Sequence, residues 1–233
     1  MKMKTAVLSD IHANAQALTA VLKDCEKQGV ERVWMLGDYV DYGADPGQVM
    51  ELIANTGAEH MIAGNHDGCQ YLHKVRPSAT EHGKLAYEYT KEIIEKNRVQ
   101  FRLLEKISKV PEKYIKQKKI LLIHGTPEDP YWGKFRPDEN SQHLFQYMEK
   151  SDIELMLMGH SHIGFLIRQN GRMILNPGSV GQPRDGCPKA SYAILDDDSV
   201  IFRRISYDID GAADAIKRAG LPEYLWKRLY IGR

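Results

Sequence analysis

The sequence predicts an α/β fold in which helices pack on a parallel sheet, and three observations lead to this prediction. Between residues 5 and 63, short apolar runs alternate with helical patterns, as in strands joined by right-handed crossovers. Turns rich in Asp, Asn or His follow these runs, and such sheets bind ligands beyond the carboxyl ends of their strands. After residue 164 the strand-like runs come at short spacing, which indicates antiparallel strands.

The first elements follow from the spacing of apolar residues. Residues 5–8 form an apolar run typical of a buried strand, and the runs at 33–36 and 60–63 predict two more strands. A helix is predicted in each interval between them. The apolar residues of the two helical faces are Leu18, Val21, Leu22 and Cys25 in the first helix, which stops at Gly29, and Val49, Leu52 and Ile53 in the second.

The remaining elements are predicted in the same way. Residues 78–108 form a polar helical excursion, residues 120–123 form a buried strand that ends at His124, and residues 125–137 form a proline-rich loop. A single domain is predicted for residues 1–233, because no linker or internal repeat interrupts the chain. The last predicted elements are a helix at 141–150, strands at 155–158, 165–167, 173–175, 191–195 and 200–205, and a helix that includes 212–219.

The composition excludes several functional classes. Hydrophobic residues make up 42% of the 233 residues, yet no run approaches the ~18 apolar residues of a membrane span. The N-terminal stretch MKMKTAVLSD has too short an apolar part for a signal peptide. Three cysteines without a C-x-x-C pair favour a cytoplasmic location over a disulfide framework. A net charge of +1 argues against nucleic acid as the main partner.

Five turns share one design, in which an apolar run is followed by Asp, Asn or His. In the D-x-H and H-x-H pairs, a spacing of two lets both side chains point the same way along an extended backbone. These residue types suit divalent ions such as Mn²⁺, Fe²⁺ and Zn²⁺, so the turns predict a metal site. The five turns are Asp10-Ile11-His12, Gly37-Asp38-Tyr39-Val40-Asp41, Gly64-Asn65-His66-Asp67, His124-Gly125 and Gly159-His160-Ser161-His162.

The number of candidate ligands predicts two ions rather than one. The candidates are Asp10, His12, Asp38, Asn65, His124, His160 and His162. Two ions about 3.5–4 Å apart that share a carboxylate have the geometry that stabilises the attacking and leaving oxygens in phosphoryl displacement. Asp38 is predicted to be the shared carboxylate, because Asp41 lies one turn away, where it can hold a neighbouring side chain in position.

The order D-x-H, G-D-x-x-D, G-N-H-D, H and G-H-x-H, which spans residues 10–162, resembles the calcineurin-like metallophosphoesterases. The stretch NPGSVGQPR at residues 176–184 resembles a small prokaryotic branch of predicted phosphodiesterases, some of which hydrolyse dinucleoside polyphosphates. The resemblance implies a four-layer α-β-β-α sandwich, with two mixed sheets flanked by helices. It also implies the two ligand sets: Asp10, His12, Asp38 and His162 for one ion, and Asp38, Asn65, His124 and His160 for the other.

The resemblance further implies a hydrolytic mechanism. A metal-bridging hydroxide attacks phosphorus, and His66, oriented by Asp67, acts as general acid or phosphate clamp. Manganese is the first candidate metal, and iron, zinc, nickel, cobalt and magnesium are the others. We therefore expect a two-metal hydrolase of phosphodiester or phosphoanhydride bonds. The alternatives are a phosphomonoesterase, including a protein phosphatase, and a non-catalytic scaffold, which the complete ligand set and His66 disfavour.

Residues outside the five turns would select the substrate. Arg184 either binds a substrate phosphate bidentately or is an ordinary loop arginine. Tyr131 and Trp132 either stack on a nucleobase or, as loop aromatics more often do, pack against the domain. Lys134 and Arg136 beside them suit a phosphate chain that ends in a base, so the expected partner is a small phosphorylated molecule such as a nucleotide. No membrane partner is expected, and a homo-oligomer is left open.

Overall fold

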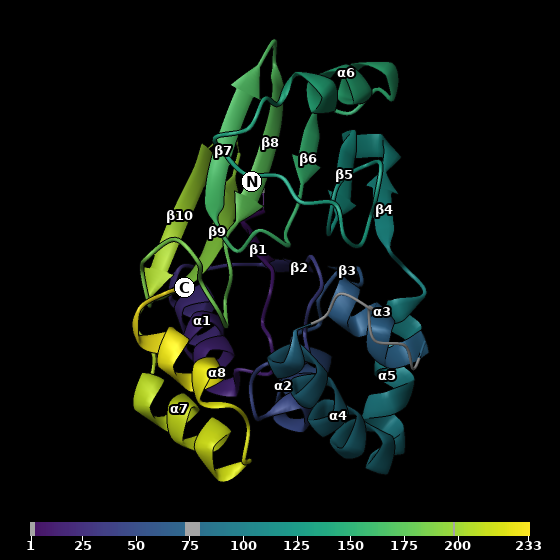
Figure 1. Cartoon of the computed structure of the whole chain (residues 1–233). Helices are drawn as coiled ribbons and strands as arrows, with labels where there is room; N and C mark the ends of the chain where they lie inside the picture. Colours follow the sequence, from purple (N-terminus) through teal and green to yellow (C-terminus); the bar gives the residue numbers. More distant parts are fainter. Residues whose placement is uncertain (1–2, 73–79, 198) are drawn as a thin grey trace.

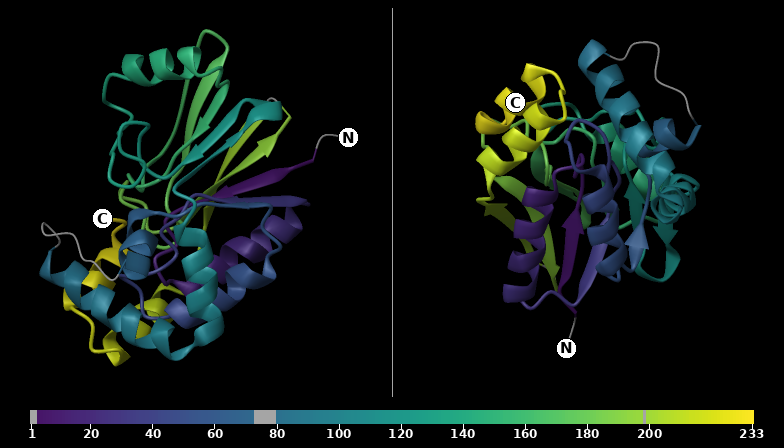
Figure 2. Two further views of the ribbon diagram at one scale, coloured as in Figure 1. Left: turned by 90° about the vertical axis from the view of Figure 1, so that its right-hand side faces the viewer. Right: turned by 90° about the horizontal axis from the view of Figure 1, so that it is seen from below.

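The computed structural model describes residues 3–72, 80–197 and 199–233. Two five-stranded sheets are stacked face to face, and helices lie outside them (Figures 1 and 2). Each sheet contains both parallel and antiparallel neighbours. The α/β class and the arrangement of two mixed sheets flanked by helices are therefore confirmed. The single domain over residues 1–233 stays a prediction.

The first sheet is built around β1 (Figure 1). In order across the sheet, its strands are β10 (Ser199–Ile205), β9 (Ala190–Asp196), β1 (Thr5–Leu8), β2 (Arg32–Met35) and β3 (His60–Met61). The strands β1, β2 and β3 are parallel, as the alternation of strands and helices predicts. On the other side, β9 runs antiparallel to β1, with Val7 opposite Ala193.

The second sheet contains the middle of the chain. In order, its strands are β4 (Glu112–Ile115), β5 (Ile120–Ile123), β6 (Leu155–Leu157), β8 (Arg172–Pro177) and β7 (Gly164–Gln169). Three of them, β5, β6 and β8, are parallel, with Leu122 opposite Leu157 and Leu157 opposite Leu175. The predicted antiparallel strands of the last third are divided between the sheets, because β7 and β8 pair in this sheet and β9 and β10 in the first.

The helices cover the two outer faces unequally. Most of them gather below the first sheet in Figure 1, while α6 lies against the second. Among the described residues, no helix has the length and apolar character needed to cross a membrane. The helices are α1 (Ala15–Lys27), α2 (Pro46–Asn55), α3 (Asn65–Leu72), α4 (Glu81–Lys96), α5 (Arg98–Ser108), α6 (Gln142–Lys150), α7 (Ile209–Arg218) and α8 (Glu223–Lys227), with short 3-10 turns η1 (Lys116–Lys118) and η2 (Arg228–Tyr230).

An apolar layer joins the two sheets. One buried cluster contains residues from both sheets. Val7, Leu36 and Ile62 lie in or directly after strands of the first sheet, and Leu122 and Leu157 belong to the second. Burial of such side chains stabilises a fold by about 1.5–3 kcal/mol each. The layer fixes the two sheets relative to each other, so loops that follow strands of different sheets can form one site.

Most element positions agree with the sequence-based prediction, and the differences have structural causes. The excursion at 78–108 is two helices, α4 and α5, apart from residues 78 and 79, which lie outside the described residues. The predicted turn at Asn65 is the first turn of α3. Neither β4 nor α8 was predicted: β4 is largely exposed and held by pairing with β5, and α8 has only five residues.

Candidate metal centre

All five predicted metal turns follow the carboxyl ends of parallel strands. Asp10 and His12 follow β1, Asp38 follows β2, and His124 follows β5. His160 and His162 follow β6, and Asn65 begins α3 a short turn after β3 ends at Met61. The side chains meet between the two sheets, so all seven predicted ligands lie in one region. Their roles as ligands stay a prediction until a metal is measured.

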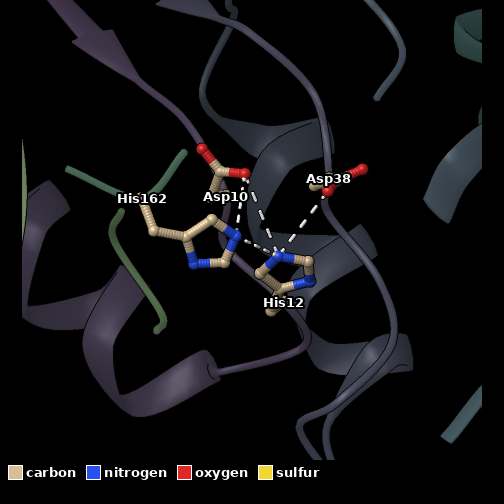
Figure 3. Close-up of side chains that lie close together, drawn as sticks. All are labelled: Asp10, His12, Asp38 and His162. Carbon is tan, nitrogen blue, oxygen red and sulfur yellow. Dashed lines mark hydrogen bonds and ion pairs between the residues drawn. The ribbon is translucent and has the colours of Figure 1, made fainter. Parts of the chain in front are cut away.

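The first cluster consists of Asp10, His12, Asp38 and His162, whose ligand atoms all lie within 4.8 Å of one another (Figure 3). The Nε2 atoms of His12 and His162 are 3.1 Å apart, and His162 Nε2 is 3.2 Å from Asp10 Oδ1. The same Asp10 oxygen is buried and has no hydrogen-bond partner in the described structure. The lone pairs of these nitrogen and oxygen atoms point to one place, and no hydrogen-bond donor of the described chain satisfies the Asp10 oxygen there. Such an arrangement fits a bound cation.

The second cluster consists of Asp38, His124 and His160. His124 Nε2 lies 3.3 Å from Asp38 Oδ2 and 3.2 Å from Asn65 Oδ1. That same Asp38 oxygen lies 3.6 Å from Nε2 of His12 in the first cluster. Two buried His/Asp clusters that share one carboxylate oxygen are consistent with a dinuclear metal site.

Backbone carbonyls fix the orientation of three imidazoles. The Nδ1 atoms of His12, His124 and His162 lie 3.1, 2.7 and 2.5 Å from the carbonyl oxygens of Val40, Leu36 and Gln182. Since a carbonyl only accepts, each Nδ1 carries the proton and donates it. In the neutral form of each ring, Nε2 is then free of a proton and available to a metal, as is usual for histidine ligands.

The backbone of the site is strained. Asp10, His12, Asp38, His160 and His162 all have φ values between 48° and 63°, in the left-handed region that side chains other than glycine rarely adopt. Hydrogen bonds between turns hold this conformation: Asp10 N–H donates to Gly37 O, and His12 N–H donates to Asp38 O. A Cβ on Gly64 would overlap Asp38, so only glycine allows this close approach.

The electrostatics of the site favour the metal-binding form of His12, His160 and His162, whereas His124 would have to lose a proton to a bound ion. Burial lowers the pKa of His12 and of His162, where the charge of Arg184 contributes further, and it lowers the pKa of His160 to about 3. These imidazoles are therefore neutral at pH 7, as metal ligation requires. Burial also opposes a charge on His124, but Asp38 outweighs it and raises the pKa of His124 to about 9.

The predicted orientation of His66 by Asp67 is corrected by the hydrogen bonds. His66 Nδ1 lies 2.7 Å from Asp41 Oδ2, so Asp41 orients the ring. Asp67 instead accepts hydrogen bonds from the backbone N–H groups of Asp38, Tyr39 and Gly64, at 2.7–3.0 Å. With these three hydrogen bonds, the Asp67 carboxylate positions the loop that carries Asp38. The predicted contact through which Asp67 would orient His66 is made by Asp41 instead.

His66 lies at the open side of the site. Its side chain is 16% exposed, and its ring is 5.0 Å from that of His12 and 4.7 Å from that of Tyr42, measured between centroids. Burial opposes a charge on the ring, but Tyr42, Asp38 and Asp41 together raise the pKa of His66 well above its usual value. A protonated, partly exposed imidazole beside the clusters can donate a proton or stabilise an anion.

The three residues predicted to bind substrate differ in position. Tyr131 packs against the domain, with its ring beside Gly68 and its hydroxyl donating to Ser108 O at 3.2 Å. Trp132 lies at the edge of the second cluster, 6.4 Å from the His160 ring. Arg184 N–H donates to His162 O at 3.2 Å, and its guanidinium lies 5.9 Å from the Tyr42 ring centre. Only Trp132 and Arg184 are therefore close to the clusters.

Comparisons with known proteins agree with this geometry. Residues 3–199 match the calcineurin-like phosphoesterase superfamily domain. The chain is similar to an uncharacterized protein of Methanocaldococcus jannaschii, with 36% identity over 251 residues that cover 100% of both chains. It is also similar to the crystal structure of a metallophosphoesterase from Sphaerobacter thermophilus, with 30% identity, a TM-score of 0.83 and 100% of both chains covered. A hypothetical protein from Pyrococcus horikoshii is 26% identical, with a TM-score of 0.85 over 100% of this chain and 99% of that one.

Proposed function

The chain belongs to the calcineurin-like phosphoesterase superfamily, and we propose that it hydrolyses phosphodiester or phosphoanhydride bonds, with dinucleoside polyphosphates among its candidate substrates. Its family and its buried Asp/His clusters make it a metal-dependent phosphoesterase. The type of bond that is hydrolysed, the identity of the metal and the role of each residue are proposed below. Manganese is the first candidate, because carboxylate and amide oxygens suit it, and the imidazoles keep iron, zinc and nickel among the candidates.

The shared oxygen of Asp38 is the observation that carries the proposal. It lies within 3.6 Å of His12 in one cluster and 3.3 Å of His124 in the other. In the proposed centre, Asp10, His12, Asp38 and His162 hold one ion, and Asp38, Asn65, His124 and His160 hold the other. When bound, two such ions supply an activated water and neutralise the charge that develops on phosphorus.

His66 is proposed to act on the leaving group. Asp41 accepts the Nδ1 proton and fixes the ring, which leaves Nε2 for the substrate. The raised pKa of His66 keeps the ring protonated at neutral pH, so it can protonate or stabilise the leaving oxygen. Asp67 contributes indirectly, because it holds the backbone of Asp38.

Cationic side chains favour substrates that extend beyond one phosphoryl group. The backbone N–H of Arg184 donates to His162 O, and Lys134 lies on the loop at residues 125–137. Burial, followed by the charges of Arg184 and Arg136, lowers the pKa of Lys134, as expected for three cations that approach one another. An anionic chain longer than a single phosphate would relieve this repulsion.

The experiment compares kcat/KM for a bis-aryl phosphate, an aryl monophosphate and a diadenosine polyphosphate, in wild type and in Arg184→Ala. We expect the wild type to prefer the diester and the polyphosphate, and Arg184→Ala to raise KM about tenfold for the polyphosphate alone, the equivalent of one charge-assisted contact. Arg218→Ala, an exposed arginine of α7, is the matched control. A clear preference for the monophosphate would favour the phosphomonoesterase alternative instead.

A further inference from the structure

Tyr42 holds a conformation that a tyrosine rarely adopts, and the proposed function gives it no role. Its φ is 64°, in the left-handed region, and Asp41 before it has a φ of 66°. A bulky residue keeps a positive φ only where the surrounding structure imposes it, and such residues gather at functional sites. The conformation of Asp41 serves its hydrogen bond with His66. The strain at Tyr42 calls for an explanation of its own.

The turn that carries Tyr42 is fixed on the turn that carries His12. The backbone N–H of Gly43 donates to His12 O at 3.1 Å, and that of Asp45 donates to Ala13 O at 3.0 Å. A Cβ on Gly43 would overlap His12 O, so the two turns touch backbone to backbone. These contacts impose the left-handed conformation of Tyr42 and place its side chain beside the candidate metal centre.

Three rings contact one another at this place. Between ring centres, Tyr42 lies 4.7 Å from His66 and 4.8 Å from His12, and the two imidazoles are 5.0 Å apart. The His66 ring is inclined by 61° to the Tyr42 ring and by 89° to the His12 ring, and both arrangements are edge-to-face. Aromatic rings attract each other in this geometry and at these distances. The imidazole of His66 is therefore packed against two other rings.

The other contacts of Tyr42 hold its ring in place. The ring packs against an apolar cluster that α7, α8 and η2 build, to which Ala212, Leu225 and Leu229 belong. The guanidinium of Arg184 lies over the ring, 5.9 Å from its centre. The C-terminal helices thus support a ring that reaches the metal centre.

The hydrogen bond to Asp41 alone leaves the imidazole of His66 free to tilt. Nδ1 lies 2.7 Å from Asp41 Oδ2, which fixes one edge of the ring. The side chain is 16% exposed, so solvent does not restrain its open side. A general acid works only when its proton lies within hydrogen-bond reach of the oxygen that receives it. Packing against the Tyr42 ring supplies the second restraint that a fixed orientation needs.

We propose that Tyr42 is a positioning residue for His66, and that its ring and the Asp41 carboxylate together hold the imidazole with Nε2 directed at the leaving oxygen. This inference rests on the proposed function, in which His66 assists the leaving group. As the bond from phosphorus to that oxygen breaks, the electron pair stays on the oxygen and the proton of Nε2 moves to it. A weakly basic leaving group such as a nitrophenolate departs without a proton. Tyr42 is therefore needed for substrates whose leaving groups are strong bases.

The first test compares two diesters that differ in their leaving groups, bis(4-nitrophenyl) phosphate and diphenyl phosphate. Tyr42→Leu removes the ring and should lower kcat for diphenyl phosphate about 10–100-fold, as expected when a group that orients an active residue is lost, with little change for the nitrophenyl diester. Tyr42→Phe keeps the ring and should retain kcat for both. Tyr114→Leu, at an exposed tyrosine of β4, is the matched control and should change neither. Tyr42→Leu combined with His66→Ala should lose no more than His66→Ala alone, because both changes act on one proton transfer.

A second test needs no turnover. In the full-length protein loaded with Zn²⁺, which has a filled d shell, the Nδ1 proton of His66 in its hydrogen bond with Asp41 should give a downfield proton NMR signal that His66→Ala lacks. We expect this signal in wild type and Tyr42→Phe, and its loss through faster exchange with water in Tyr42→Leu. The Nδ1 signals of His124 and His162, which donate to backbone carbonyls, should persist in every variant.

Several outcomes would refute the positioning role. These are an equal loss of kcat on both diesters in folded Tyr42→Leu, no loss on either, or a His66 signal that survives in this variant. A loss in Tyr42→Phe as large as in Tyr42→Leu would assign the effect to the hydroxyl and overturn the role of the ring. Thermal unfolding shows whether each variant is folded. Tyr42→Asn, for which the same losses are expected, replaces an unfolded Tyr42→Leu, since asparagine tolerates the left-handed conformation.

The two tests also separate this inference from the proposed function. Failure of the wild type to hydrolyse both diesters and a diadenosine polyphosphate would refute the proposed function. The NMR signals would still show whether the Tyr42 ring holds the imidazole of His66, because they require no substrate.

Discussion

Single residues at the metal centre adopt conformations that the chain would avoid elsewhere. Left-handed φ values at residues other than glycine cost about 1–3 kcal/mol each, and five of the predicted ligands have them. Buried carboxylates beside one another add to this cost. Burial opposes ionisation of Asp10, yet His162 and His124 outweigh it and hold the pKa of Asp10 well below its usual range. A bound cation would offset the repulsion between the carboxylates, and its bonds to the ligands would offset the cost of the left-handed conformations.

His66 provides the first prediction at this scale. His66→Ala should reduce kcat on the order of 10²–10⁴-fold, because a general acid is lost, while metal content stays unchanged. Asp41→Asn should cause a smaller loss of about 10–100-fold, since the ring keeps its place but loses its orienting carboxylate. Turnover of a diester with a poor leaving group measures both. Wild-type turnover in His66→Ala would remove this residue from the mechanism.

The sequence predicted single residues unevenly. The seven ligand candidates came together because strand ends of parallel sheets share an edge, a rule that needs only the order of elements. The partner of His66 could not be read in this way. Asp67 is its neighbour in sequence, whereas Asp41 lies 25 residues away and reaches the ring only through the three-dimensional path of the turns.

At the scale of elements, prediction succeeded where the residues themselves have a strong period. The strands β1 and β5 begin and end where the apolar runs do. By contrast, β4 has the sequence EKYI with three exposed residues, so its strand conformation depends on hydrogen bonds to β5 rather than on its own pattern. The helix α3 was hidden because Gly64-Asn65-His66-Asp67 resembles a turn, and tertiary contacts of Asp67 stabilise its first residues.

An ion pair that ties a helix to the first sheet gives a prediction at this scale. Asp24 of α1 accepts hydrogen bonds from Arg203 of β10 at 2.9 and 3.0 Å and from Tyr192 of β9 at 2.6 Å. The hydrogen bond from Arg203, with that from Tyr192, outweighs the effect of burial and lowers the pKa of Asp24. Asp24→Asn should therefore lower the free energy of unfolding at pH 7 by about 1 kcal/mol.

The pH dependence of this effect has a defined sign. Because the folded-state pKa of Asp24 is below the unfolded value of 3.8, its contribution is present above about pH 4 and is lost as pH falls through the folded pKa. Denaturant unfolding of wild type and Asp24→Asn between pH 7 and pH 3 measures it. The difference should shrink only below about pH 4, and a difference that grows towards low pH would contradict the assignment. Asp214→Asn, in an exposed pair with Lys217, is the control and should change stability little.

At the scale of the whole molecule, the site connects the two sheets. Asp10, His12, Asp38 and Asn65 follow strands of the first sheet, while His124, His160 and His162 follow strands of the second. Bound ions would therefore hold together two halves that are otherwise joined by the apolar layer around Leu122 and Leu157. Stability and metal binding should be coupled.

Metal removal tests this coupling. Ions present at about 100 times their Kd stabilise the folded state by about 2.7 kcal/mol, which corresponds to a shift of about 5–10 °C in Tm for a chain of this size. A chelator should lower Tm by this amount, and added Mn²⁺ should restore it. His66→Ala should show the same shift, because His66 is not in the proposed ligand set. An unchanged Tm after complete removal of metal would show that the sheets do not depend on the centre.

The central claim is that one oxygen of Asp38 serves two metal ions, and metal content tests it most directly. Wild type, Asp38→Asn and His12→Ala are purified with Mn²⁺, and bound metal per chain is measured after dialysis, with circular dichroism as the check on folding. Asp38 Oδ2 lies near ligands of both clusters, whereas His12 belongs to one. We expect two ions in wild type, about one in His12→Ala, and loss of both in Asp38→Asn. Two ions retained in folded Asp38→Asn would contradict the shared carboxylate and, with it, the proposed centre.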